Sequence, residues 1–356
     1  MLYLLVVILD FIIVGLMGYY VARSWNNKDK TGFKKINEIM HCLLTLACGF
    51  YYPLFIIQFG GNNAGIVFPT AKGDFNFIGT AIIVGIAVLM TFWALTAKVR
   101  TIRNPELLIT KNNYENFCEE FLEDYGDRNK VTRKYIHTIP FGVVGLIVIA
   151  YYLLSPFFGS KWFDYARFTI AVVGISFAFT FLIGDIVRLL GFSCMPHIVA
   201  RWFNKAMTKD EIDTFTSTSV MVFGFGPFLF FSFPIFLIVL LITAVADAFA
   251  SIFGLVASNK HYFPKGSESK KTIEGYIGGM ISTFLCTLFG VFFAWFVGKA
   301  NWPFWITLLV AGIMAITFLV IDLITSTIRL QDNYINPLIT GAILLIILPL
   351  FNISII

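Results

Sequence analysis

The residue whose type and position most clearly suggest chemistry is Asp247, an aspartate near the end of a long apolar run. A charged side chain within a membrane-spanning segment is costly and usually marks a functional site. A polar loop follows, and it carries four lysines: Lys260, Lys265, Lys270 and Lys271. Glu274 and a glycine cluster then open the next apolar run. Because carboxylates bind Mg²⁺ and ammonium groups neutralise phosphate charge, this stretch predicts a site for a metal ion and a polyphosphate.

Other polar side chains are expected to reach the same membrane face as Asp247. Asp322 lies near the end of one apolar run, and Asp332 and Asn333 open the next. Acids that converge on a lysine-rich loop are typical of a nucleotide–metal site. Asp247 also begins a row of small residues at helical spacing, which continues with Ala250, Ser251 and Gly254. Such a row favours close packing of membrane helices, which is the structural alternative for this stretch.

Two charged motifs earlier in the chain allow both a structural and a functional interpretation. Arg133, Lys134 and His137 come just before an apolar run, so they are either a basic anchor at the membrane surface or contacts to a phosphate. Asp185 and Arg188 are three residues apart and share one helix face. That spacing favours a local ion pair.

The elements that must position these residues are membrane helices. The chain is 58% apolar and only 13% charged, against roughly 25% charged in ordinary globular domains. Several apolar runs approach the length of about 20 residues that spans a bilayer. They lie near 2–22, 39–58, 77–97, 138–157, 168–187, 218–235, 236–257, 276–298, 303–325 and 335–354. We therefore predict an all-α polytopic membrane bundle of about ten helices, or nine if 218–257, divided here near Pro234, forms a single span.

The distribution of basic residues predicts the orientation. Twenty-two of the 26 Lys and Arg fall in alternate connecting segments, namely 23–38, 98–137, 188–217, 259–275 and 326–334. Because cytosolic loops are enriched in Lys and Arg, we expect the N-terminus outside and the Asp247 loop in the cytosol. The first apolar run lacks the basic start and the cleavage site of a signal peptide, so we interpret it as a membrane helix. The basic balance follows this topology and does not indicate nucleic-acid binding, and the five cysteines have no metal-ligand or redox spacing.

Two cytosolic segments between the apolar runs give local expectations. Residues 114–125 predict an amphipathic helix whose acidic face favours packing on the protein over contact with an anionic membrane. Residues 192–217, which include the charged run TKDEID, are expected to form a solvated loop. The sequence contains no P-loop, no protein-kinase glycine loop and no dinucleotide fingerprint. Any nucleotide must therefore be held by a different fold.

The stretch 247–275 reads D-A-x-A-S-x-x-G and then K-K-T-x-E-G. It resembles the signature of the CTP-dependent polyprenol kinases, which include dolichol kinase, phytol kinase and the CTP-dependent diacylglycerol kinase. Three further pieces occur in the family's order: R-K-x-x-H at 133–137, an acid-x-x-R at 185–188 and D-N-x-x-x-P-L at 332–338. The resemblance covers roughly 130–350. It implies a membrane-embedded catalytic core in 131–356, preceded by membrane helices and the amphipathic helix in 1–130.

The resemblance implies an enzyme that transfers the γ-phosphate of CTP to a membrane-embedded alcohol. Dolichol or another polyprenol is the first choice of acceptor, with a phytol-type isoprenoid or diacylglycerol as alternatives. Asp247, Asp322 and Asp332 would hold Mg²⁺, and the catalytic set would comprise Asp247, Lys270, Lys271, Glu274 and Asp322. The nucleotide would be held by Lys270 and Lys271 together with Ser251, Thr272, Gly275, Arg133, Lys134 and His137. Asn333, Asp185 and Arg188 complete the matching motifs.

Other functions remain open on the sequence. CDP-diacylglycerol synthase, a related cytidylyltransferase, shares the K-K-T-x-E-G-x-x-G-G pattern of 270–279. This chain differs from the synthases in having Glu268-Ser269 in place of Ser-Pro, and from the kinases in having Ala246 in place of Gly. A third alternative is a transporter or scaffold whose acids line an ion path. The kinase assignment places the protein in the endoplasmic reticulum membrane of a eukaryote or the plasma membrane of a prokaryote, and a homodimer is compatible with it.

Overall fold

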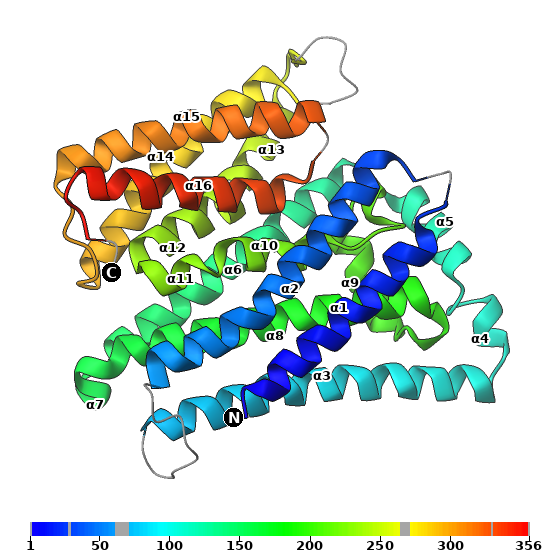
Figure 1. Ribbon diagram of the computed structural model, residues 1–356. Helices are drawn as coiled ribbons and strands as arrows, with labels where there is room; N and C mark the ends of the chain where they lie inside the picture. The colour runs from blue at the N-terminus through cyan, green and yellow to red at the C-terminus, as the bar shows by residue number, and fades with distance from the viewer. Residues whose placement is uncertain (1, 28–29, 61–70, 264–270, 329, 355–356) are drawn as a thin grey trace. The chain divides into compact units, whose positions relative to one another are not determined.

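The protein is built from helices throughout its described part. A computed structural model describes residues 2–27, 30–60, 71–263, 271–328 and 330–354. Within these ranges no strand is present, and one isolated antiparallel bridge pairs Tyr262 with Thr272. Nine helical segments among the described residues are long and apolar enough to cross a membrane (Figure 1). The protein is therefore an all-α polytopic membrane protein, as its composition predicts.

The apolar stretch 218–257 contains one full-length span and one shorter helical segment. Phe233–Val256 is long enough to cross a bilayer, whereas Ser217–Phe231 falls short of 18 residues. Ser232 separates the two with an extended backbone, and Pro234 lies in the first turn of the second. Pro is well accommodated there because the first-turn amide has no helical partner. The expected division near Pro234 is confirmed, and the expected tenth helix is the short segment.

The chain forms two compact units, each assembled from separate stretches of sequence. Unit 1 comprises 1–133 and 164–223, and unit 2 comprises 134–163 and 224–356. The two units are defined by how compactly their residues pack. The functional boundary that we expect between residues 130 and 131 is a separate matter and stays a prediction.

Unit 1 contains the N-terminal membrane helices and the helices that follow them on the chain. Its helices are α1 (Leu4–Ser24), α2 (Gly32–Gly60), α3 (Ala71–Arg103), α4 (Glu106–Ile109), α5 (Tyr114–Asp124), the start of α6 (Asp127–Leu153), most of α8 (Trp162–Leu190), α9 (His197–Ala206) and most of α10 (Ser217–Phe225). Asn113 caps α5 by accepting the amide protons of Glu115 and Asn116. Phe117 and Phe121 of α5 then pack against Phe192 and Phe203. The prediction that this amphipathic helix packs on the protein is confirmed.

The expectation of a solvated loop at 192–217 is wrong. The segment includes the ten-residue helix α9, whose Val199 and Phe203 are buried. These side chains complete the aromatic cluster beneath α5. Burying an apolar side chain of this size contributes roughly 2 kcal/mol, which outweighs the cost of ordering a polar stretch. The charged residues that suggested a loop lie on the other face of α9 and in the turn that follows.

Unit 2 contains the remaining membrane helices. They are most of α6, α7 (Ser155–Phe158), α11 (Phe228–Phe231), α12 (Phe233–Leu241), α13 (Asp247–Val256), α14 (Ile273–Phe296), α15 (Phe304–Ile328) and α16 (Asp332–Leu350). A π-helical turn, Ile242–Ala246, joins α12 to α13. A Cβ atom added at Gly254 would lie 2.9 Å from the Thr272 hydroxyl, and one added at Gly275 would lie 3.1 Å from the Ala250 carbonyl oxygen. The row of small residues on α13 is therefore a packing face against α14, as expected.

Candidate functional site

Asp247 is buried at the start of α13, with 6% of its surface exposed. Lys134 of α6 donates to its Oδ2 at 2.5 Å. The π-helical turn lies immediately before Asp247 and adds a residue to that turn of the span. Turns of this kind change the direction in which the following side chains point and are frequent at functional sites. A buried carboxylate is thus paired with a cation from a helix more than a hundred residues earlier.

Lys271 lies directly before α14 and contacts two further carboxylates. Its ammonium group pairs with Asp322 near the end of α15, and its Nζ lies 3.4 Å from Oδ2 of Asp332 at the start of α16. Burial alone would lower the pKa of Lys271, but the charges of Asp322 and Asp332 outweigh it and raise that pKa above its ordinary value. Lys271 therefore remains a cation at any physiological pH.

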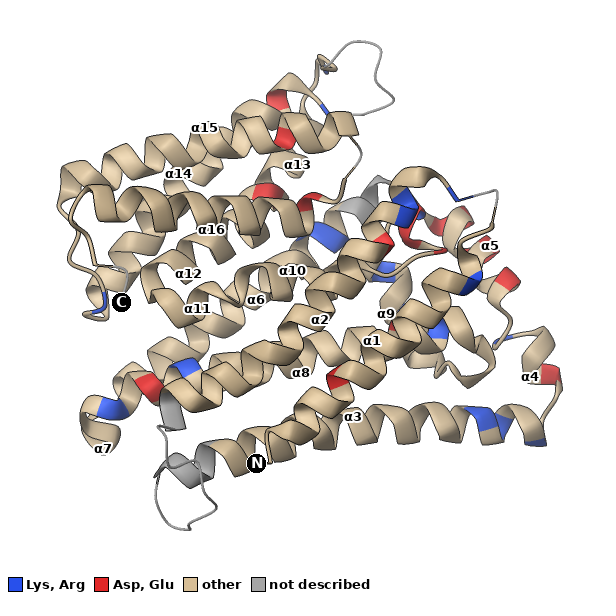
Figure 2. Cartoon of the chain, viewed as in Figure 1, with Lys and Arg blue, Asp and Glu red and all other residues tan. Residues whose placement is uncertain are grey.

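These five side chains form what we call the charge cluster: Lys134, Asp247, Lys271, Asp322 and Asp332. All belong to unit 2. Asp247 acts electrostatically on both Lys271 and Asp322, which links the two ion pairs into one group. Figure 2 shows acidic segments of unit 2 at neighbouring ends of α15 and α16. With three carboxylates and two ammonium groups, the cluster carries a formal charge of −1. Its carboxylates could bind a metal cation, and its two ammonium groups could contact an anion.

The start of α14 closes the loop that carries Lys271. The Thr272 hydroxyl caps the helix by accepting the Gly275 amide proton at 3.1 Å. The Ile273 amide donates to the carbonyl of His261, and the Tyr276 amide donates to the carbonyl of Thr272. Three of the first four amides are thus occupied by the chain itself. Direct binding of phosphate by these three amides is therefore disfavoured.

Glu274 has a local partner in the same loop. Its carboxylate lies 2.5 Å from Nδ1 of His261 and accepts the His261 amide proton at 3.2 Å. Both contacts tie the loop after α13 to the first turn of α14. The side chain of Glu274 thus contacts His261 and supports the conformation of the loop. It makes no described contact with the charge cluster.

The carboxylates of the charge cluster fit a magnesium ion only in a limited way. Within the described part of the chain, no three His, Cys, Asp or Glu side chains form a set that could hold a metal by themselves. Mg²⁺ is nevertheless commonly bound by one or two carboxylates together with substrate phosphates and water. The oxygen ligands of Asp247, Asp322 and Asp332 have the chemistry for an ion that arrives with a nucleotide. They do not form a preassembled cage.

Arg133, Asp185 and Arg188 lie in unit 1 and hold one segment, residues 206–217, in place. Arg188 pairs with Asp185 at 2.7 Å and also donates to the carbonyls of Ile212 and Thr214. Asp185 in turn accepts from the amide and hydroxyl of Thr216 at 2.8 Å. The Asp185–Arg188 ion pair favoured by the sequence is confirmed. Its buried contacts are those of a structural clamp.

Arg133 belongs to the same clamp. Its guanidinium donates to the Ala206 carbonyl and the Ser217 hydroxyl, and it lies 3.8 Å from Glu211. The neighbouring Lys134 instead pairs with Asp247 in unit 2. Two adjacent basic residues expected to share a phosphate therefore make different contacts.

The other predicted site residues have simple positions. His137 is buried on α6, and Asn333 is buried on α16 one residue after Asp332. Ser251 is half-buried, four residues after Asp247, and its hydroxyl makes no hydrogen bond to any described residue. Lys270 lies outside the described residues. None of these positions conflicts with the predicted roles, which stay predictions.

The pairing of Lys134 with Asp247 was not evident from the sequence, because the two residues are 113 positions apart. We also did not predict a second buried ion pair, between Lys30 and Glu38, whose side chains are both 1% exposed. The available signal was a lysine and a glutamate eight residues apart at the start of an apolar run. In unit 1 this pair supports packing, because Lys30 also donates to the hydroxyl groups of Tyr20 and Ser24.

Fold and site together define a polytopic α-helical membrane protein with a partly buried cluster of carboxylates and lysines. Comparison of the chain with protein-family models, curated proteins and solved structures gives no match. A functional assignment therefore depends on the sequence motifs and on the contacts within unit 2.

Proposed function

We propose that this protein is a CTP-dependent lipid kinase that transfers the γ-phosphate of CTP to a membrane-embedded alcohol. The observation that carries the proposal is the contact of Lys271 with Asp322 and Asp332 in unit 2. These residues come from the lysine motif at 270–275, the end of α15 and the D-N-x-x-x-P-L motif, which are far apart in the sequence. Two of the motifs that resemble the polyprenol kinases thus meet at one ion pair. Asp247 of a third motif interacts with the same lysine.

The chemistry of phosphoryl transfer matches the side chains of the charge cluster. The acceptor hydroxyl oxygen bonds to the γ-phosphorus while the bond to the β-phosphate oxygen breaks, so CDP leaves and the hydroxyl proton passes to a base. Negative charge spreads over the phosphoryl oxygens, and fixed cations stabilise it. Lys271 would contact the triphosphate, and Lys134 would hold the buried Asp247 in its orientation. Asp247, Asp322 and Asp332 would hold Mg²⁺, which supplies further charge neutralisation when bound.

The position of the reaction suits a lipid acceptor. Asp322 and Asp332 lie at the ends of helices long and apolar enough to cross a membrane. A hydroxyl at the surface of the bilayer would meet a water-soluble nucleotide at this depth. Dolichol or another polyprenol is the first acceptor to test, followed by phytol and diacylglycerol.

The experiment is a labelling assay with purified protein in mixed micelles. CTP labelled in the γ-phosphate or in the α-phosphate is offered with Mg²⁺ and with dolichol, phytol, diacylglycerol or phosphatidate. The proposal requires label from the γ position to enter an alcohol. Label from the α position in a lipid, with phosphatidate present, would instead identify a cytidylyltransferase. No label from either position, with the protein folded, would contradict both enzymatic assignments and favour the transporter alternative.

A further inference from the structure

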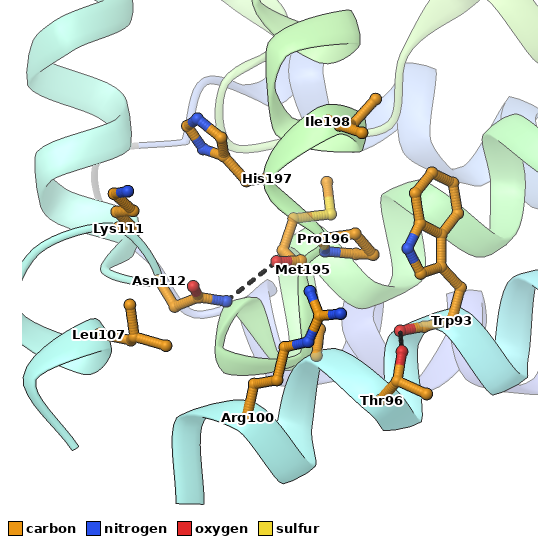
Figure 3. A pocket seen from close by; sticks show the side chains of 11 residues that line it. Trp93, Thr96, Arg100, Leu107, Lys111, Asn112, Met195, Pro196, His197 and Ile198 are labelled. Atoms are coloured by element: carbon orange, nitrogen blue, oxygen red, sulfur yellow. Dashed lines mark hydrogen bonds between the residues drawn. The ribbon is translucent and has the colours of Figure 1, made fainter. Parts of the chain in front are cut away.

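A pocket in unit 1 is lined by basic side chains and lies beside the C-terminal end of α3. It has a volume of about 220 Å³ and lies between the end of α3, the segment around α4 and the start of α9. Arg100, Lys111 and His197 line it, together with Trp93 and Thr96. Figure 3 shows Arg100 rising from α3 toward Met195 and Pro196, with Lys111 and His197 to one side of it. None of these residues belongs to the charge cluster.

The basic groups of the pocket are available for a ligand. Within the described residues, Arg100, Lys111 and His197 make no ion pair, and no hydrogen bond engages their side chains. Two hydrogen bonds hold the pocket wall around Met195 in place: Asn112 donates to the Met195 carbonyl at 2.9 Å, and Lys98 of α3 donates to the Ser193 hydroxyl at 2.9 Å. A fixed cavity with unpaired cations fits an anion.

The first turn of α9 adds to the preference for an anion. Pro196 precedes the helix, and no side chain caps it. The amide groups of His197 and Ile198 are therefore without helical partners at the pocket. A helix start of this kind carries partial positive charge and binds phosphate readily.

The surroundings of the pocket are those of a membrane–water interface. α3 is apolar over residues 77–97 and carries Lys98, Arg100 and Arg103 at its end. Beside the pocket residues of α3 lies a row of exposed apolar side chains: Leu89, Phe92, Leu95, Val99 and Ile102. On α9, Ile198 and Trp202 are about half exposed and Arg201 and Lys205 are exposed. A helix with exposed Trp, apolar and basic side chains is typical of the headgroup region.

We propose that this pocket binds the phosphate of an anionic phospholipid, with the acyl chains lying along the exposed apolar row of α3. The phosphate contacts Arg100, Lys111 and the start of α9, while Trp93 packs against the glycerol region. The site needs no feature of the charge cluster and is independent of the kinase proposal.

The test compares lipid binding by the full chain and two matched double variants. Arg100→Gln with Lys111→Gln removes two pocket charges, and Arg103→Gln with Lys205→Gln removes two nearby charges that do not line the pocket. Each protein is reconstituted in dioleoyl-phosphatidylcholine nanodiscs with increasing dioleoyl-phosphatidylglycerol. Retained lipid is then counted by native mass spectrometry. We expect the preference of the pocket variant for phosphatidylglycerol to fall by about thirtyfold, since two basic residues are removed and each contributes roughly 1 kcal/mol near an anionic surface. The matched control should keep it.

Two further measurements, displacement by inorganic phosphate and the single variant Lys111→Gln, complete the test. Equal losses in both double variants would overturn the proposal, because they would show non-specific attraction to the basic surface. Displacement of the lipid by millimolar inorganic phosphate would overturn the assignment to a lipid and identify a site for a soluble anion. Lys111→Gln alone, a change at an exposed position, repeats the test if the double variant has a lower melting temperature in pure phosphatidylcholine. A preserved preference in that folded single variant would also contradict the proposal.

Discussion

Both lysines of the charge cluster are already paired with carboxylates, so a substrate must compete with contacts that the protein makes itself. Lys134 is held by Asp247 at 2.5 Å, and Lys271 lies between Asp322 and Asp332. Removing one partner of a buried pair leaves an uncompensated charge and commonly costs about 3 to 5 kcal/mol. Any substitution in the cluster must therefore be tested for folding and for activity separately.

Asp247→Asn is expected to reduce phosphate transfer severely, because it removes the charge of the buried carboxylate and keeps its shape. A loss of charge stabilisation of about 3 kcal/mol lowers the rate by roughly two orders of magnitude. The measurement is transfer from γ-labelled CTP beside the melting temperature in detergent. Asp210→Asn, a change at an exposed residue, serves as the control.

The effect on folding can be removed from this test. In Asp247→Asn the ammonium group of Lys134 loses its carboxylate, whereas in Lys134→Gln with Asp247→Asn both charges are absent. We expect the double variant to recover stability without recovering activity. Near-normal turnover in the single variant would exclude Asp247 from the site.

Lys271→Arg is expected to preserve membrane insertion and to weaken the use of CTP. An ammonium group is a compact point charge, and the planar guanidinium is bulkier and prefers bidentate geometry. With carboxylates on two sides, the larger group should fit poorly against phosphate oxygens. We expect kcat/KM for CTP to fall by about a hundredfold. Lys260→Arg, in the exposed part of the same loop, is the control. If both variants have the same kcat/KM for CTP, Lys271 serves only as a basic residue of a cytosolic loop.

Among the structural elements, the segment 206–217 shows how a charged stretch becomes part of a folded unit. Glu211 is buried and accepts the amide protons of Thr208 and Ser217 at 2.7 and 2.8 Å. Burial would raise the pKa of this carboxyl, but Arg133 and these hydrogen bonds hold that pKa below its ordinary value of 4.5. The ionised form is therefore the form that the fold stabilises.

This lowered pKa predicts acid sensitivity of unit 1. Because the pKa of Glu211 is lower in the folded than in the unfolded state, its contribution to stability is fully present above about pH 4.5. The contribution is lost as the pH falls through the folded-state value. Melting temperatures measured from pH 7 to pH 3 should fall less steeply for Glu211→Gln than for the unaltered chain. The same slope in both proteins would show that Glu211 is not stabilised in this way.

The sequence predicts elements well where periodicity and length decide and poorly where long-range contacts decide. The apolar runs predict the membrane helices, and the small row from Asp247 to Gly254 predicts the α13–α14 packing. The position of α9 could not be read, because its helical pattern is short and lies beside the charged run TKDEID. The contacts of the site depend on pairs such as Lys271 and Asp322, which only folding brings together. Motif order identified most of the charge cluster, but it also grouped Arg133 with Lys134, and the two make different contacts.

For the whole molecule, orientation in the membrane is the prediction with the widest consequence. With the short segment Ser217–Phe231 counted as a crossing, the basic segments predict that the loop after α13 is cytosolic. The connection between α14 and α15 is then expected on the opposite side. A CTP-using site requires this arrangement, because the nucleotide is cytosolic. The two exposed positions Lys260 and Asn301 represent the two sides.

Cysteine labelling tests the orientation directly. In a chain whose five native cysteines are replaced, Lys260→Cys should react with an impermeant maleimide only when the cytosolic face is accessible. Asn301→Cys should react only from the other side. Labelling with the opposite pattern would reverse the topology and contradict a cytosolic nucleotide site.

The π-helical turn at Ile242–Ala246 gives this span an unusual tolerance. In a regular α-helix, deleting one residue turns everything on one side of the deletion by about 100° and destroys the packing of that side. A π turn already holds one residue more than the helix needs, so deleting a residue there lets the backbone return to the regular spacing. The membrane helix would survive at nearly its full length. Asp247 would also keep nearly its present direction relative to α12, whereas the same deletion made earlier, in the regular helix α12, would turn Asp247 away from Lys134.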